Sequence, residues 1–215
     1  MKNESVSSLT EKPESKDIAG QSIKKPELLE EFFNGVFSKS PEVKFGSAKA
    51  LRIISEKSPQ LLYPRIDFFI NLLDNENTIL KWTALDIIAN LTTTDTDNKF
   101  NRIFDKFYNY LNEGSLITAG HVVDGSGTIA LSKPELVNRI TEKLLKVEEV
   151  PLPTSECRNI LIGKTISAFG MYFNKIENKD EIIAFVKRHL NNSRNATRKK
   201  AEKFLAKFAS NKKKR

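Results

Sequence analysis

Apolar residues recur along most of this chain at the three- and four-residue spacing of amphipathic helices. In residues 80–91, LKWTALDIIANL, a projection at about 100° per residue gathers one apolar stripe: Leu80, Ala84, Ile87, Ile88 and Leu91. Trp82, Asp86 and Ala89 fall on the opposite face. The pattern predicts a helix with a buried stripe on one side. On its other side it predicts either a second packing contact or a binding surface.

Similar segments alternate between two kinds of amphipathic helix. The first kind is expected at residues 28–38, 61–73, 99–111, 135–147 and 179–190, and the second kind at 43–56, 79–92, 116–131, 157–173 and 197–208. Polar breaks rich in Pro, Asn, Asp and Gly separate them, as expected for helix ends and caps. No segment shows a convincing alternation of period two, so the sequence predicts an all-α fold.

Helices of the second kind share a pattern of small and aliphatic residues. Val43-Lys44 is followed by Ser47 and Ala48, and related patterns start at 80, 117, 157 and 197, at spacings of 37, 37, 40 and 40 residues. The pattern resembles HEAT/armadillo-type repeats over residues 28–208. This resemblance implies a right-handed α-solenoid of about five HEAT-like antiparallel helix pairs. The alternative is a compact bundle of five pairs with accidental periodicity.

The two ends differ in composition from the repeats. Residues 1–25 are polar and rich in Ser, Lys and Glu, which predicts a disordered N-terminal arm. The HEAT-like helical repeat domain is expected at 26–209, opened by Pro26 in the first turn, and a basic flexible tail at 210–215.

The formal charge of +8 is concentrated near the C-terminus. Residues 194–215 contain ten Lys or Arg and one acidic residue, a net of +9, so the rest of the chain is near neutral. The basic end favours either nucleic-acid binding or a polar capping helix. No apolar run is long enough to span a bilayer, and no signal peptide is recognisable, so we expect no membrane partner. The single cysteine, Cys157, is typical of a cytoplasmic protein.

In HEAT-like arrays the second helices line the concave side, so the resemblance identifies their non-core faces as the binding surface. The candidates are Phe45, Lys49, Arg52, Trp82, Asp86, Ala89, Asn159, Gly163 and Ile166. Trp82 and Asp86 are one helical turn apart, as an aromatic anchor with a charged neighbour would be. In the alternative interpretation Trp82 packs on a neighbouring helix and Asp86 pairs with Lys49 or Arg52.

The third second-kind helix, within residues 115–136, is rich in glycine and allows two registers. The 37-residue spacing would bury His121 and Asp124. A shift of one residue instead buries Ala119, Val123, Gly127 and Ala130, together with Leu116, and turns both polar residues outward. We prefer the shifted register, because buried polar groups without partners are costly.

With this register, Trp82, Asp86, His121 and Asp124 are expected on neighbouring helices. A histidine beside carboxylates can act as a general acid/base or a partial metal site. The competing interpretation is a packing histidine bonded to Asp124. His189 lies on the other kind of helix and Cys157 has no partner in motif spacing, so we predict no metal site and no cofactor.

The Trp82-x-x-x-Asp86 pair also resembles HEAT-like alkylpurine DNA glycosylases. Those enzymes carry a Trp four residues before a catalytic Asp and an Arg on the following repeat. The resemblance implies that Trp82 would stack on the nucleotide and that Asp86 would stabilise the oxocarbenium charge. The Arg has no counterpart here, and His121 occupies about that region. Asp86 and His121 are therefore the candidate catalytic residues.

No phosphate-binding loop and no HExxH, GxSxG or CxxC motif occurs. The sequence therefore favours a non-catalytic HEAT-repeat scaffold that binds a protein or peptide on its concave face. The alternative is a DNA- or RNA-binding HEAT-like protein, a class that includes base-excision enzymes of the alkylpurine DNA glycosylase type.

Overall fold

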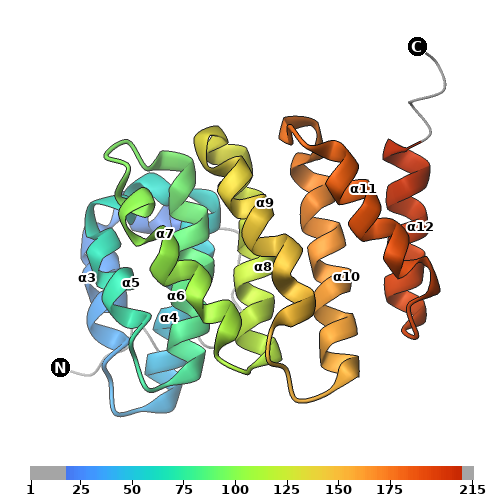
Figure 1. Cartoon of the computed structure of the whole chain (residues 1–215). Coiled ribbons are helices and arrows are strands. Elements are labelled where there is room, and N and C mark those ends of the chain that lie inside the picture. Colours follow the sequence, from blue (N-terminus) through green and yellow to red (C-terminus); the bar gives the residue numbers. More distant parts are fainter. Residues whose placement is uncertain (1–17, 210–215) are drawn as a thin grey trace. The chain divides into compact units, whose positions relative to one another are not determined.

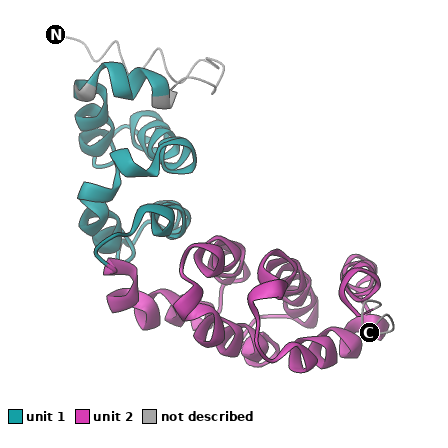
Figure 2. Cartoon of the chain, turned by 90° about the horizontal axis from the view of Figure 1, so that it is seen from above, with its two compact units in different colours: residues 1–97 teal, residues 98–215 magenta. Residues whose placement is uncertain are grey.

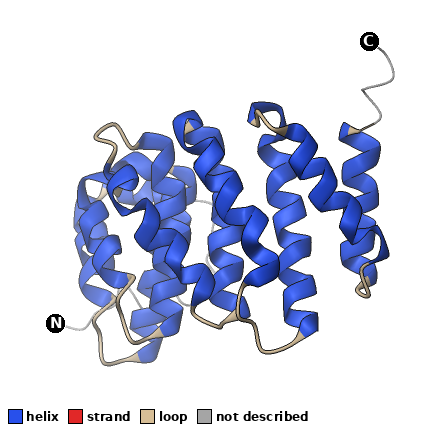
Figure 3. Ribbon diagram, in the orientation of Figure 1, coloured by secondary structure: helices blue, strands red, loops and turns tan. Residues whose placement is uncertain are grey.

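A computed structural model of the chain describes residues 18–209, which form helices joined by loops without any β-strand (Figure 3). The predicted 210–215 tail and residues 1–17 of the predicted arm lie outside the described residues. The end of that arm differs from the prediction, because Ile18–Lys24 forms helix α2, which packs against α3 (Pro26–Gly35) and α4 (Pro41–Lys57). Tertiary contact there buries Ser22, which the local composition does not reveal.

The chain divides into two compact units, residues 1–97 (unit 1) and 98–215 (unit 2), shown in Figure 2. Unit 1 contains α3 (Pro26–Gly35), α4 (Pro41–Lys57), α5 (Ile66–Leu72) and α6 (Thr78–Leu91). Unit 2 contains α7 (Lys99–Asn109), α8 (Leu116–Ser132), α9 (Val137–Leu145), α10 (Ser155–Tyr172), α11 (Lys179–Arg188) and α12 (Asn195–Phe208). These are the predicted first and second helices of successive pairs.

Short 3₁₀ segments extend or interrupt several helices. They are Pro59–Leu61, Tyr63–Arg65, Thr92–Thr94, Tyr110–Asn112, Pro134–Leu136, Lys146–Glu149, Phe173–Lys175 and His189–Asn191. The helix predicted at 61–73 is shortened to α5 for this reason. Pro64 has no N–H group to donate, so the regular helix starts only at Ile66.

Three of the second helices, α6, α8 and α10, begin at side-chain caps in the polar breaks, whereas α4 and α12 have no side-chain cap. The Asn77 side chain accepts hydrogen bonds from the backbone N–H groups of Ile79 and Leu80 at the start of α6. Ser115 and Thr154 cap α8 and α10 in the same manner. These bonds satisfy backbone donors that have no partner within the helix, and so they fix where α6, α8 and α10 start.

The apolar stripe predicted in α6 is confirmed, and all its members are at most 3% exposed: Leu80, Ala84, Ile87, Ile88 and Leu91. The opposite face is not wholly open, because α6 packs against α4 as well as α5. Ala89 is consequently buried, and its assignment to the binding surface is wrong. Leu85 is also completely buried. Burial on two sides leaves a narrow outward strip on α6.

In unit 2, α8, α10 and α12 stand side by side, and α9 and α11 cross in front of them (Figure 1). Glycines allow these second helices to approach closely. A Cβ added to Gly120 of α8 would lie 3.3 Å from Cε of Lys164, and one added to Gly127 would lie 2.3 Å from Sδ of Met171. The glycines that weaken α8 by propensity therefore make room for side chains of α10.

Side-chain bonds between successive pairs match the repeat length. The Arg65 guanidinium pairs with Glu30, 35 residues away, and Arg139 pairs with Asp105, 34 residues away. Arg139 also lies 4.0 Å from the centroid of the Phe104 ring. Within the first pair of unit 2, the Tyr108 hydroxyl donates to Ser126 Oγ, 3.0 Å away, in a fully buried contact. Successive pairs thus stack in register within each unit.

Candidate functional site

The outward side chains of the second helices form a strip at three- and four-residue spacing on each helix; we call these strips the second-helix face of each unit. In unit 1 the strip contains Glu42, Phe45, Lys49, Arg52 and Glu56 of α4 and Ile79, Trp82, Asp86 and Asn90 of α6, all exposed or half-buried. Most of the sequence-predicted candidates in unit 1 therefore lie on one helical face of α4 or α6.

The α4 part of this face combines an aromatic ring with charged side chains. Phe45 is half-buried and Lys49 is exposed. Arg52 pairs with Glu56 one turn later, with Nη1 and Oε1 3.0 Å apart. Both side chains are at least 40% exposed, so this ion pair contributes little stability and can exchange for a partner's charge.

On α6, Trp82 and Asp86 are both half-buried. Trp82 therefore presents part of its ring outward and packs the rest against the protein, which combines features of the two sequence-based interpretations. Near the end of α6, Nδ2 of Asn90 donates to Ser55 Oγ of α4, 2.9 Å away. This bond fixes the spacing of the two second helices of unit 1.

In unit 2 the shifted register of α8 is confirmed. Ala119, Val123 and Ala130 are completely buried and Gly127 is buried, whereas Leu116, which was predicted in the same stripe, is half-buried. His121 is half-buried and Asp124 is exposed. The outward strip of α8 consists of Ile117, His121, Asp124, Thr128 and Leu131. The carboxylate of Asp124 accepts a hydrogen bond from the Lys164 ammonium of α10. Asp124 is thus paired with a lysine that the sequence pattern did not indicate.

Lys164 and Met171 lie two turns apart on the side of α10 that covers Gly120 and Gly127 of α8. Met171 is 49% exposed, and the Lys164 side chain is 35% exposed. Both therefore line the second-helix face at the junction of α8 and α10.

The sequence-based prediction that two α10 residues lie on this surface is wrong. Gly163 is buried because it faces α12, where an added Cβ would lie 2.8 Å from Thr197 Oγ1. Ile166 is 1% exposed. Because α10 packs against both α8 and α12, as well as the 3₁₀ segments before and after it, its helical spacing alone does not identify the outward face.

Asn159 holds the turn before α12 in place through hydrogen bonds. Its Nδ2 donates to Ser193 Oγ at 2.8 Å, and its Oδ1 accepts from Asn192 Nδ2 at 2.9 Å. Its backbone oxygen accepts from Thr197 Oγ1 at 2.7 Å. Arg194 pairs with Glu156 at the same turn. These bonds indicate a structural role for Asn159, which links α10 to the start of α12.

Lys200 of α12 completes a group of charges with Lys164 and Asp124. The methylene chain of Lys200 lies near Gly163, with Cδ 3.6 Å from the position of an added Cβ. Burial lowers the pKa of the Lys200 ammonium below its ordinary value, and the positive charge of Lys164 lowers it further, while Asp124 opposes this shift. Lys164, which pairs with Asp124, and Lys200 therefore both lie at the junction of α10 and α12.

The predicted catalytic cluster is distributed over both units. Trp82 and Asp86 belong to unit 1, and His121 and Asp124 belong to unit 2. The sequence of α8 contains no Arg that could match the glycosylase pattern. Within residues 18–209 no group of three or more His, Cys, Asp or Glu side chains could hold a metal ion.

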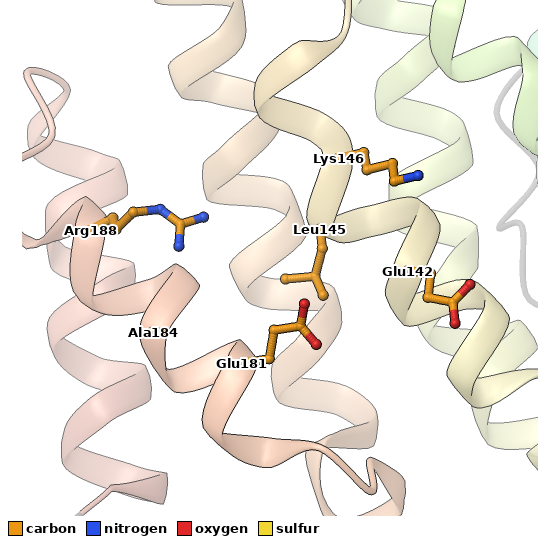
Figure 4. Close-up of a pocket in the computed structure, with 6 residues that line it drawn as sticks. All are labelled: Glu142, Leu145, Lys146, Glu181, Ala184 and Arg188. Atoms are coloured by element: carbon orange, nitrogen blue, oxygen red, sulfur yellow. The ribbon is translucent and has the colours of Figure 1, made fainter.

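The first helices of unit 2 border two shallow clefts that the sequence did not indicate. One, of about 370 Å³, lies between α9 and α11, with Glu181 and Arg188 on one side and Leu145 on the other (Figure 4). Another, of about 420 Å³, lies beside Tyr108 and Lys143. The acidic and basic side chains of the first cleft balance, and Arg188 already pairs with Glu148 at 2.6 Å.

Known structures resemble this fold closely in architecture and only distantly in sequence. A designed armadillo repeat protein aligns with a TM-score of 0.62 at 14% identity, covering 94% of this chain and 98% of its own. An engineered protein from the Northeast Structural Genomics Consortium aligns with a TM-score of 0.57 at 15% identity, covering 96% and 88%. No protein-family model and no curated protein matches the sequence. The predicted HEAT/armadillo-like, all-α solenoid fold is confirmed.

Proposed function

We propose that this protein is a non-catalytic repeat scaffold that binds a protein or peptide partner on its second-helix faces. The observation that carries the proposal is the composition of these faces. Each places partly exposed apolar side chains beside charged ones at helical spacing, as in Phe45 with Lys49 and Trp82 with Asp86. Such surfaces combine anchors that bury large apolar areas with charges that orient the partner.

The repeat architecture supports this proposal. Stacked helix pairs present equivalent positions of successive second helices at a regular spacing, so one extended partner can contact several of them. Half-buried aromatic side chains are already partly immobilised, and their ordering on binding costs less than that of a fully exposed chain. Phe45 and Trp82 meet this condition in unit 1.

The test is a selection from a random peptide-display library, followed by affinity measurement of the selected peptides by fluorescence anisotropy. Trp82→Ala and Phe45→Ala should each weaken binding of peptides that use unit 1, by about tenfold or more for an anchor residue. Phe37→Ala is the matched control, since Phe37 is 64% exposed, lies just after α3 and packs on the Phe68 ring of the first helix α5. Selected peptides that respond to Phe37→Ala and to no second-helix variant would refute the proposal.

Nucleic-acid binding is the second candidate, favoured by the exposed Lys199, Lys200, Lys203 and Lys207 of α12. Titration with plain and alkylated duplex DNA at low and moderate salt separates the candidates, with Trp82 fluorescence and anisotropy of labelled DNA as readouts. Salt-sensitive binding would support this second function. Release of the alkylated base by the wild type and its loss in Asp86→Asn would indicate the glycosylase activity.

A further inference from the structure

The second-helix face of unit 2 carries more positive than negative charge. Lys164 of α10 and Lys200 of α12 flank the junction of the two helices, and Lys203 and Lys207 continue the α12 strip at helical spacing. Asp124 is bound to Lys164, and Glu156 is bound to Arg194 at the preceding turn. Burial lowers the pKa of Lys200, and the positive charge of Lys164 acts in the same direction, while Asp124 opposes it. An anionic partner would relieve the repulsion between the two lysines.

Aliphatic side chains share the same face. Met171 lies two turns from Lys164 along α10 and is 49% exposed. On α8, Ile117 is 53% exposed and Leu131 is 42% exposed. Lone exposed aliphatic residues are ordinary on a protein surface. Here three of them lie on the outward strips of α8 and α10, together with Lys164, and α12 adds the other lysines. A complementary partner therefore needs both carboxylates and apolar side chains.

The aromatic residues of this region distinguish a peptide from a single-stranded nucleic acid. Among the described residues of α8, α10 and α12, no Phe, Tyr or Trp is exposed. Phe169, Tyr172 and Phe204 are buried, and Phe208 is half-buried against Phe173. Single-stranded nucleic acids are held by bases stacked on aromatic platforms, which this face does not offer. Apolar positions beside lysines instead suit a polypeptide whose acidic and aliphatic side chains alternate.

We propose that the face formed by α8, α10 and α12 binds an acidic peptide segment that carries aliphatic side chains. The inference rests on the proposed function and names the chemistry of the partner. An ammonium group has three donors, so Lys164 can donate to a second carboxylate while it keeps its bond to Asp124. Lys200 and Lys203 supply the next positive positions, and Met171 supplies the apolar contact.

The direct test measures anisotropy of a fluorescein-labelled synthetic peptide of Glu and Leu residues against the full chain. Two further peptides serve as probes, one with Gln in place of Glu and one with Ser in place of Leu. Of the three peptides, we expect only the Glu/Leu peptide to bind. Its affinity should weaken when the ionic strength rises from about 0.1 M to about 1 M, because the Debye length falls from about 10 Å to about 3 Å. Equal binding of the Gln peptide would overturn the inference.

Variants locate the site. The double variant Lys164→Gln with Lys200→Gln should weaken the Glu/Leu peptide by about tenfold, and Met171→Ser should weaken it by severalfold. The matched control is Lys187→Gln, because Lys187 is an exposed lysine of the same unit on α11. Far-UV circular dichroism of each variant confirms that it is folded. An equal loss of affinity in Lys187→Gln would show that only net charge matters and would overturn the inference.

The outcomes separate this inference from the function on which it rests. Display-selected peptides that lack acidic residues but depend on second-helix side chains would refute the acidic partner and leave the scaffold function standing. Failure of every selected peptide to depend on a second-helix face would refute both. Duplex DNA that displaces the Glu/Leu peptide and binds more tightly at moderate salt would assign the surface to nucleic acid and refute the peptide partner.

Discussion

The glycines of α10 offer a sensitive test of how the second helices pack. Gly163 and Gly170 lie two turns apart in the same helix. An added Cβ at Gly163 would lie 2.8 Å from Thr197 Oγ1, whereas at Gly170 the nearest atom, Cδ2 of Phe204, would be 3.8 Å away. The first distance requires a neighbour to move, and the second is ordinary van der Waals contact. We therefore expect Gly163→Ala and Gly170→Ala to differ markedly in stability.

The magnitude follows from two opposing terms. Alanine stabilises a helix relative to glycine by up to about 1 kcal/mol, and this term is similar for both substitutions. Gly163→Ala also overpacks the α10–α12 contact, at a cost of about 1–3 kcal/mol. Thr197 has little freedom to yield, because it is 1% exposed and its hydroxyl donates to the Asn159 carbonyl at 2.7 Å. Gly163→Ala should therefore be about 1–3 kcal/mol less stable than Gly170→Ala.

Urea denaturation followed by far-UV circular dichroism measures this difference, and thermal melts should agree, at about 2–4 °C per kcal/mol for a chain of this size. Thr197→Ala removes the hydroxyl that blocks the new methyl group. In that background the penalty of Gly163→Ala should shrink, which gives a double-mutant cycle with a nonzero coupling energy. A Gly163→Ala protein as stable as Gly170→Ala would show that α10 and α12 do not approach as described, and would refute the reasoning.

Three further predictions concern buried polar groups. Tyr108→Phe should lower the free energy of unfolding by about 1 kcal/mol. Ser126→Ala should lower it by about 1–3 kcal/mol, because it leaves the buried Tyr108 hydroxyl without its acceptor. The double variant should lose less than the sum of the two, and additive losses in urea denaturation would contradict the contact. Ser47→Ala should be neutral or stabilising by about 1 kcal/mol, because Ser47 Oγ is buried without a hydrogen-bond partner, and a clear loss of stability would reveal an overlooked bond. Burial lowers the pKa of His189 below 6.5, although Glu148 opposes the shift. The unfolded chain therefore binds more protons than the folded one, and the free energy of unfolding should fall as the pH drops through the pKa of the unfolded histidine. His189→Gln should flatten this dependence between about pH 7 and about pH 5, and an unchanged slope in denaturation midpoints would disprove it.

The outward strips show how far helical spacing alone can place a site. Phe45, Lys49, Trp82 and Asp86 are exposed or half-buried on their helices, as the period of the apolar stripes predicts. The register of α8 could also be predicted from the sequence, because burying His121 and Asp124 without partners would have been costly. Gly163 could not be placed in this way. A helix packed on several sides has little polar face, so its period does not reveal which direction is solvent.

The sequence by itself determined the order of helices, their caps, the repeat length and the buried stripes, because these depend on contacts within a few residues and on a local period. Only the tertiary structure decided which side chains meet across pairs. Lys164 reaches Asp124 over a separation of 40 residues, and Lys200 lies beside them on a third helix. Such meetings depend on how closely α8, α10 and α12 pack at Gly120 and Gly163, since a small change in helix spacing would separate charges that the sequence places far apart.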